Sequence, residues 1–496
     1  MRFSSRSTAH PRRRSWRSAF SLFVVGLALA MTSCVPSLQD NPPHEPSRAV
    51  PASFGGPRPQ ATSAAQQKWS EIFGSPELQQ LITTALSNNQ ELNLQLQEII
   101  IARNEAYART GEYRPRVDVG ATMGVEKVGD RTSQGVGDEQ AGLAKNLGDF
   151  SFGLRGSWEL DVWNKLRNGA KAANLRYLAS IEARRFLVTQ IIAEIARSYF
   201  ELIAIDSRLE ILTRNIAIQT NALEVVRLQW QAARVTELAV QRFEAEVLKN
   251  QAHRYNLEQE RTQTENRINF LVGRYPQPVR RSTDEFRQAS PRAIGVGLPS
   301  ELLTNRPDVR AAELTLQAAK LDVSAAKAAF YPSFTIDAEL GYQSFNLAHL
   351  IATPAALAYR LAGGLVAPVL NRRAITAQYR TANAMQIQAV IRYEQTVLRA
   401  FTDVANQLAI IDNLQRSYEL QQQQVDKLTS SVETSNLLFQ SARADYMEVL
   451  LTRRDSLEAE MELVETKQQQ FQTMVNIYQA LGGGWQTSSS KVAGQR

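Results

Sequence analysis

Residues 188–230 read VTQIIAEIARSYFELIAIDSRLEILTRNIAIQTNALEVVRLQW, and an apolar side chain recurs at every seventh position of this run: Val188, Ile195, Leu202, Leu209, Ile216, Leu223 and Trp230. The same spacing returns later in the chain, at Val397, Val404, Ile411, Tyr418, Val425, Val432 and Phe439. Neither of the surrounding stretches, 170–272 and 369–481, contains a glycine or a proline. A repeat of this kind, sustained over so many turns, predicts long helices that wind around neighbouring helices in a left-handed supercoil.

Each apolar run is interrupted by a short segment at the same point of the repeat. These segments are Ala233, Arg234, Val235 and Thr236 in the first run, and Ala442, Arg443, Ala444 and Asp445 in the second. Thr236 and Asp445 are short polar residues followed by acids and by fresh apolar periodicity, which is typical of helix N-caps. The sequence therefore predicts two helical hairpins, over 170–272 and 370–481, and a duplicated unit.

Two other segments, 113–160 and 331–369, alternate apolar and polar residues and predict two pairs of β-strands of about ten residues each, a length that can cross a bilayer. Polar, loop-like stretches at 126–147 and 345–353 separate the strands within each pair. Arg155 and Glu339 fall on the polar phase of their strands. Periodicity alone leaves two interpretations open, because ordinary soluble hairpins have the same pattern.

Strand number bears on the choice between these interpretations. Four strands cannot form a closed barrel in lipid, because the open edges would leave backbone groups unpaired in hydrocarbon. Two copies would give eight strands and an interior filled by side chains, whereas three copies would give twelve and leave room for water. If the strands cross a membrane, we expect a homotrimer.

The N-terminus has the layout of an export signal. Six arginines among the first 17 residues precede the apolar run 19–31 and the small residues before Cys34, the only cysteine. We expect 1–33 to be a lipoprotein signal peptide, with Cys34 acylated, and we prefer this to an ordinary cleaved signal. Proline-rich residues 34–68 predict an extended tether. Removing the six arginines lowers the formal charge from +7 to +1, so no nucleic-acid partner is expected.

Several short motifs together resemble the TolC-like outer-membrane efflux proteins, in particular the OprM/NodT lipoprotein subgroup. They cover most of the chain from Trp69 to Trp485, and their order and spacing are specific: Ser157–Asp161, Leu298–Ser300, Leu303, Arg306–Asp308, Ala312–Glu313, Ala329–Ser333, Ala400–Ala405 and Leu481–Trp485.

The resemblance implies a mainly helical fold with a transmembrane β part: a trimeric, 12-stranded barrel continued by a 12-helix coiled-coil tunnel in the periplasm. Each copy would contain a first repeat (69–273), a linker (274–297), a second repeat (298–485) and a flexible tail (486–496). The implied function is the outer-membrane exit duct of a tripartite efflux pump that passes drugs and other toxic compounds. Its partners would be a periplasmic adaptor, which meets the two hairpin turns, and an inner-membrane pump of the RND type.

The chain departs from the subgroup where the duct narrows. Relatives carry Leu, Asp and Arg at the positions matched here by Met447, Leu451 and Arg454, so no Asp-to-Arg clasp can form at Leu451. Closure would depend instead on a ring of Met447 and Leu451 side chains, with Asp445, Glu448 and Asp455 available to Arg443 and Arg454. These apolar side chains could equally pack at a helix interface. Ala233 and Ala442 stand where relatives usually have glycine, which predicts strain if φ is positive there.

The chain offers no catalytic or metal-binding pattern. Its four histidines have no spacing typical of metal ligands, and no phosphate-binding loop or nucleophile elbow occurs. We therefore expect no enzyme activity and no cofactor. Two alternatives remain open: a lipid-anchored periplasmic coiled-coil scaffold, and the exit duct of a type I protein secretion system.

Overall fold

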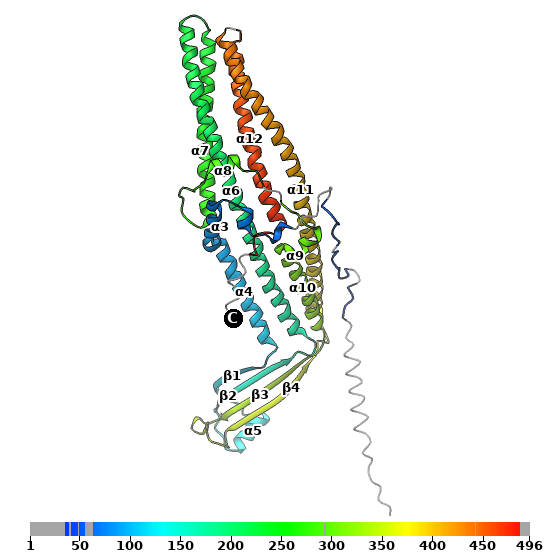
Figure 1. Cartoon of the computed structure of the whole chain (residues 1–496). Coiled ribbons are helices and arrows are strands. Elements are labelled where there is room, and N and C mark those ends of the chain that lie inside the picture. Colours follow the sequence, from blue (N-terminus) through cyan, green and yellow to red (C-terminus); the bar gives the residue numbers. More distant parts are fainter. Residues whose placement is uncertain are drawn as a thin grey trace, which may run out of the picture. The chain divides into compact units, whose positions relative to one another are not determined.

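The computed structural model describes residues 35–38, 41–47, 49–54, 63–291, 294–441 and 443–486 (Figure 1). The predicted signal peptide, Cys34, Ala442 and residues 487–496 lie outside this part of the chain. The chain divides into two compact units. One contains residues 101–177 and 315–390 with the described residues before 46, and the other contains the rest.

The first unit contains one antiparallel sheet in the order β1-β2-β3-β4 (Figure 1). The strands lie within the predicted segments: β1 (Arg116–Glu126), β2 (Leu147–Leu160), β3 (Ser333–Ser344) and β4 (Leu357–Val366). The stretch 126–147 is not the simple loop that its composition predicts, because it contains α5 (Ser133–Gln140). Thr132 begins this helix by accepting a hydrogen bond from the Gly135 N–H. The other loop contains the short helix η3 (Leu347–His349).

Residues 64–112, in the N-terminal part of the structure, are divided among four helices. The structure has η1 (Ala64–Gln66), α2 (Trp69–Ile72), α3 (Pro76–Asn88) and α4 (Gln90–Glu112). Asn89 separates α3 from α4: its Oδ1 accepts a hydrogen bond from the Leu92 N–H, and its Nδ2 donates to the Leu271 carbonyl. A residue that caps one helix and ties the chain to another segment therefore ends α3 early.

The long helices form the two hairpins predicted from the heptads: α6 (Lys165–Gln231) with α7 (Glu237–Val272), and α11 (Arg373–Gln440) with α12 (Tyr446–Ala480). Thr236 and Asp445 are the N-cap residues as predicted, although neither side chain accepts a capping hydrogen bond. Among the described residues, no helix is both long and apolar enough to cross a membrane.

The two heptad series differ in burial. In α6 the first six positions of the series, from Val188 to Leu223, are all buried, and Leu209 and Ile216 belong to an apolar cluster with Leu257 and Leu457. In α11 only Val404 is buried, while the other six positions are half-exposed. A single chain therefore buries the heptad positions of α6, here called the α6 seam, and leaves most of those of α11, the α11 seam, partly exposed.

The second half begins with η2 (Pro299–Glu301), α9 (Leu302–Asn305) and α10 (Pro307–Ala328). Several of the short motifs meet here. The buried guanidinium of Arg306 contacts Asp308, Asp403 and the Ala480 carbonyl. Burial would lower the pKa of Arg306, but hydrogen bonds and charges of the two aspartates raise it above its ordinary value.

Residues 481–485 pack against the end of α9. The indole of Trp485 donates to the Asn305 carbonyl at 3.1 Å. Gly482 adopts φ +85°, and a Cβ there would lie 2.6 Å from that same carbonyl oxygen. The Gly-rich terminal motif is thus explained by a left-handed turn against a close backbone neighbour.

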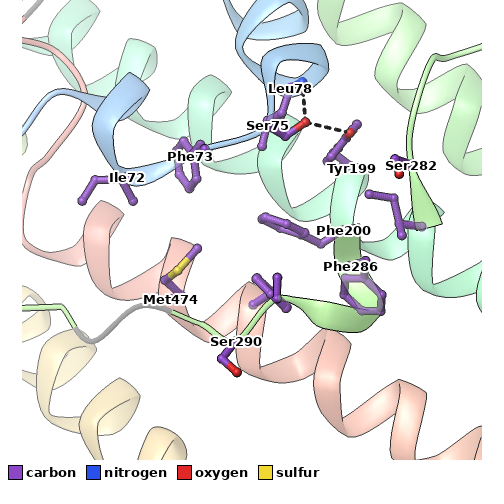
Figure 2. A pocket seen from close by; sticks show the side chains of 14 residues that line it. Ile72, Phe73, Ser75, Leu78, Tyr199, Phe200, Ser282, Phe286, Ser290 and Met474 are labelled. Atoms are coloured by element: carbon purple, nitrogen blue, oxygen red, sulfur yellow. Dashed lines mark hydrogen bonds between the residues drawn. The ribbon is translucent and has the colours of Figure 1, made fainter. Parts of the chain in front are cut away.

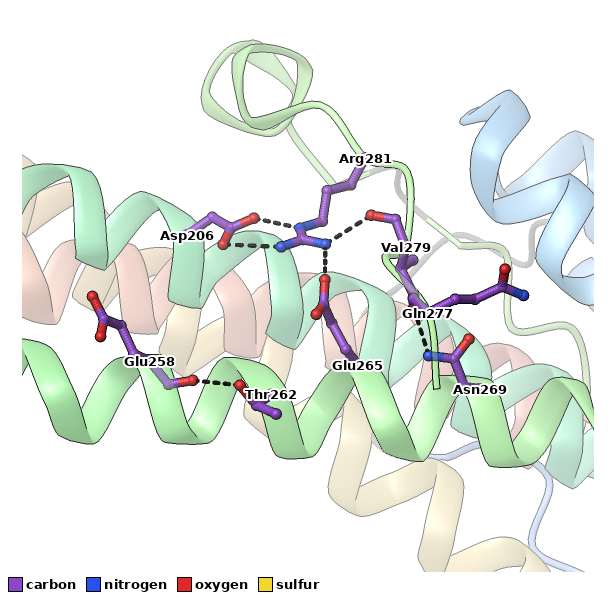
Figure 3. Close-up of polar contacts among 8 residues, drawn as sticks. All are labelled: Asp206, Glu258, Thr262, Glu265, Asn269, Gln277, Val279 and Arg281. Carbon is purple, nitrogen blue, oxygen red and sulfur yellow. Dashed lines mark hydrogen bonds and ion pairs between the residues drawn. The ribbon is translucent and has the colours of Figure 1, made fainter. Parts of the chain in front are cut away.

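The segment 274–297, expected as a linker, contains the helix α8 (Thr283–Gln288) and is attached to α6 and α7. Figure 3 shows the attachment: Arg281 binds Asp206 of α6, Glu265 of α7 and the Val279 carbonyl. Burial would lower the pKa of Arg281, but the hydrogen bonds and charges of both carboxylates raise it.

Part of the expected tether also packs. In the first unit, the carbonyls of Asn41 and His44 accept hydrogen bonds from Asn383 and Gln386 of α11, at 2.7 and 2.8 Å. Because proline has no backbone N–H, a proline-rich segment has few backbone donors, and its carbonyls are available to the amide side chains of a neighbouring helix. The composition had predicted an extended segment without such contacts.

Candidate functional site

The sheet has one apolar face and one polar face. The register brings Val119 of β1, Leu154 of β2, Leu340 of β3 and Tyr359 of β4 into one row across all four strands. These side chains are exposed, Tyr359 to 82%. Most of the other side chains on this face are also apolar: Val117, Ala121, Met123, Val125, Phe150, Phe152, Trp158, Phe334, Ile336, Ala338, Leu357, Leu361 and Leu365. A wide uncovered apolar surface of this kind is suited to lipid.

The opposite face carries a row of alternating charge. Asp118, Arg155, Glu339 and Arg360 face one another in sequence across β1, β2, β3 and β4. Arg155 Nε lies 3.4 Å from Glu339 Oε1. The sequence predicted Arg155 and Glu339 on the polar faces of their strands, as observed. It did not predict the row of four charges, because periodicity within one strand does not determine the register between strands.

Both outer strands of the sheet have a free edge. Among the described residues, β1 pairs only with β2, and β4 pairs only with β3. Each therefore presents a row of unpaired backbone N–H and C=O groups. An edge of this kind is a template for another strand.

The first hairpin turn follows Gln231. Ala233 has φ +56°, and its N–H donates to the Trp230 carbonyl at 2.8 Å. The N–H of Arg234 donates to the Gln229 carbonyl at 2.8 Å, which closes the turn. The expected strain at Ala233 is thus present, because an alanine Cβ is unfavourable in the left-handed region. Side chains before the turn are exposed, as Leu228 shows at 65%.

The second turn has one backbone hydrogen bond that corresponds to a bond of the first. The N–H of Arg443 donates to the Leu438 carbonyl at 2.8 Å. Its side chain forms no ion pair with any described residue, so the structure does not place Asp445 or Glu448 beside it. Arg454 does pair with Asp455, at 3.0 Å, which is one of the partners that the sequence offered.

The predicted aperture residues lie near the start of α12. Met447 is half-buried, and its sulfur accepts a hydrogen bond from Arg242 Nη1 of α7 at 3.4 Å. Leu451 is 41% exposed, one turn further along the helix. Within one chain, neither Met447 nor Leu451 is fully buried in the core of its hairpin.

The second unit also contains a cavity of about 220 Å³ (Figure 2). Phe200 and Phe471 stack at 4.7 Å beside it, and Phe286 of α8 lies 5.3 Å from Phe471. Ser75 and Tyr199 form a hydrogen bond at 3.0 Å on another wall. Since Phe286 is buried, this aromatic cluster is a second attachment of the linker.

Comparison with protein families gives one match over most of the chain. Residues 81–274 and 298–483 match the family described as "Outer membrane efflux protein". Because the two matched segments each contain a strand pair and a helical hairpin, both halves of the chain contribute to the match.

Individual proteins are similar over nearly their full length. The pyoverdine export outer membrane protein OpmQ of Pseudomonas putida is 28% identical over 474 residues, which are 94% of this chain and 98% of OpmQ. The probable outer membrane lipoprotein SilC of Salmonella typhimurium is 26% identical over 468 residues, 94% of this chain and 98% of SilC. The open-state structure of the Neisseria gonorrhoeae MtrE outer membrane channel superposes with a TM-score of 0.79 at 25% identity, covering 90% of this chain and 98% of MtrE.

Proposed function

Since this chain belongs to the outer membrane efflux protein family, we propose that three copies of it assemble into one duct that crosses the outer membrane. The chain is an outer-membrane component of an efflux system. Four strands from each of three copies would close a barrel of twelve strands. The proposal rests on one observation above all: a four-stranded sheet with an exposed apolar face and two free edges.

The free edges require further strands. In hydrocarbon, each unpaired backbone group costs several kcal/mol, so the sheet becomes stable there only when β4 of one copy meets β1 of another. Two copies would give a barrel with a filled interior, whereas three leave a lumen for water. The polar face, with its row of charges, would then line the lumen and the apolar face would contact lipid.

The helices support the same assembly. The α6 seam is buried within the chain, but six of the seven α11 positions are half-exposed. Packing of α11 against a neighbouring copy would bury this second seam and continue the barrel as a helical tunnel.

The partners proposed are a periplasmic adaptor and an inner-membrane pump of the RND type. We assign adaptor contact to the two turns, Ala233–Thr236 and Ala442–Asp445. Exposed apolar side chains beside the first turn, such as Leu228 and Trp230, offer contact area there. The duct itself is passive, and the energy for transport comes from the pump. Acylated Cys34 would hold each copy to the outer-membrane lipid.

Closure of the periplasmic end is assigned to Met447 and Leu451, with Arg454 beside them. A narrow ring of apolar side chains excludes water and so blocks ions. Leu451→Ser should raise single-channel conductance in planar bilayers, because a hydroxyl wets the constriction. The matched control is Leu248→Ser, at an exposed leucine of α7, which should leave conductance unchanged. An unchanged conductance in Leu451→Ser would contradict the ring.

The duct itself is tested with the mature, lipidated protein. Light scattering in detergent should give the mass of three chains, and planar bilayers should conduct. In a strain deleted for the gene, sensitivity to toxic compounds should rise and should be restored by the intact chain. A monomeric, water-soluble protein without conductance would indicate the coiled-coil scaffold, whereas loss of protein export alone would indicate type I secretion.

A further inference from the structure

We propose that β4 of one copy pairs with β1 of the next in a single register, in which Ala362 faces Gly120 of the neighbouring copy. This inference rests on the proposed function, because it supposes that copies share one barrel. It goes further by fixing which residues of two neighbouring copies face one another. The argument starts from the staggered ends of the four strands within one chain.

At one end of the sheet, β4 extends beyond β1. Arg116, the first residue of β1, faces Ser157 of β2. Through Asp337 of β3, the same row reaches Ala362 of β4. From Ala362 the strand continues four more residues, to Val366. At this end β4 therefore reaches four residues further than β1.

At the other end the order is reversed. Leu357, the first residue of β4, faces Tyr342. Through Phe152, this row reaches Ala121 of β1, and β1 continues five more residues to Glu126. Both ends thus show that β4 is displaced by four to five residues along the strand direction, relative to β1 of the same chain.

Symmetry turns this displacement into a register. Because the copies are related by symmetry, β1 of the neighbouring copy lies at the same height as β1 of the first copy. All ten residues of β4 then have partners when β4 pairs with the part of β1 that lies level with it. Val366 then faces Arg116 of the neighbouring copy, and Leu357 faces Val125 of that copy. A change by one residue would turn every apolar side chain to the wrong face, so only even displacements are possible.

The tilt distinguishes among the even displacements. A rise of about 3.3 Å per residue and a spacing of about 4.8 Å between strands give a tilt near 35° for four residues across four strands. Membrane barrels have tilts of about 35–45°. Displacements of zero and two residues give only about 0° and 19°. A displacement of six gives about 46°, at the upper limit of that range, but it carries Leu357 past Glu126 and leaves this residue of β4 without a partner on β1.

The side chains of β4 and of the neighbouring β1 that would face one another are compatible with a displacement of four residues. On the apolar face Leu365 meets Val117 of the neighbouring copy. On the polar face Gly364 meets Asp118 of that copy, which leaves the carboxylate room. At each boundary between copies, the row of alternating charge is therefore displaced by four residues along the strand direction, and it does not close into a flat ring.

Paired cysteines test the register. Ala362→Cys is combined in turn with a cysteine at 116, 118, 120 or 122, all on the polar face. Directly opposed residues have Cβ atoms about 4.5–5.5 Å apart, close to the distance that a disulfide bridges, while two residues of displacement add about 6.6 Å along the strand. A Cβ at position 120 meets no atom within 4 Å.

We expect the Gly120→Cys, Ala362→Cys variant to shift, after mild oxidation, from one chain to covalently linked chains on a non-reducing gel. The other three double variants should stay mainly uncrosslinked, and Ala362→Cys alone controls for exchange with Cys34. Preferential crosslinking at 116, 118 or 122, or none at 120, would overturn the register. Mass measured in detergent before oxidation tests the trimer separately: a trimer with the wrong crosslink refutes only the register, whereas a monomer refutes the assembly.

Discussion

Arg306 and Asp403 are 97 residues apart in sequence, yet Arg306 Nη1 lies 3.3 Å from Asp403 Oδ2 in the second unit. The arginine side chain is only 5% exposed, and Asp308 binds its other edge. One guanidinium thus joins the start of α10, the middle of α11 and, through the Ala480 carbonyl, the end of α12.

Replacing Arg306 by Met should therefore be strongly destabilising. Two aspartates and a carbonyl would lose their partner, and breaking a buried ion pair costs about 3–5 kcal/mol. Thermal unfolding followed by circular dichroism at the helix band would detect the loss. Arg109→Met is the control, because its pairs with Glu105 and Glu112 are exposed and are worth at most about 1 kcal/mol. Equal effects of the two variants would contradict the role of Arg306.

Gly482→Ala should also destabilise the second unit, by more than about 1 kcal/mol. The added Cβ would meet the Asn305 carbonyl at a residue with φ +85°, where alanine is unfavourable. The same melting experiment measures it. Gly74→Ala is the control, since its Cβ meets no atom within 4 Å, and it should change stability by less than about 1 kcal/mol.

Arg281→Met should release the linker from α6 and α7. Asp206 and Glu265 would be left without their shared cation, and Phe286 would become accessible when α8 detaches. Limited digestion with chymotrypsin, read by mass spectrometry, should then show cleavage after Phe286 in addition to the fully exposed Tyr275.

The neighbouring residue supplies the control for that experiment. Arg280 is exposed, so Arg280→Met should keep the digestion pattern of the unchanged protein. Protection of Phe286 in Arg281→Met would mean that the aromatic cluster alone is sufficient to hold the linker.

Ala233→Gly should stabilise the first hairpin turn by up to about 1 kcal/mol, because glycine adopts a positive φ without the Cβ penalty. Hydrogen exchange of the amides of Ala233 and Arg234, which close the turn, should slow. Ala232→Gly provides the comparison: that residue has no positive φ, and the substitution should speed exchange instead. Faster exchange in both variants would show that no strain is stored at Ala233.

The elements were predictable where the signal is local. Seven-residue spacing located α6 and α11, alternation located all four strands, and a short polar residue located the start of α7 at Thr236 and of α12 at Asp445. In each case the pattern reflects which face of one helix or strand is buried, and this can be read from residues that are close in sequence.

What escaped prediction depends on residues far apart in sequence. Asn89 ends α3 because its amide reaches Leu271, and the four charged residues from Asp118 to Arg360 align only through three successive strand registers. The turn strain at Ala233 was expected only because relatives have glycine there. The aperture residues were named from their matched positions, and one chain by itself does not bring their counterparts together.

The free edges of β1 and β4 have a genetic consequence. If three copies share one barrel, as proposed, a copy whose edge cannot accept a strand also inactivates the two intact copies of the same barrel, because a barrel with an unpaired edge is not closed against lipid. A mild excess of such copies would silence most ducts in a cell that still carries the intact gene, so edge mutations should be inherited as dominant.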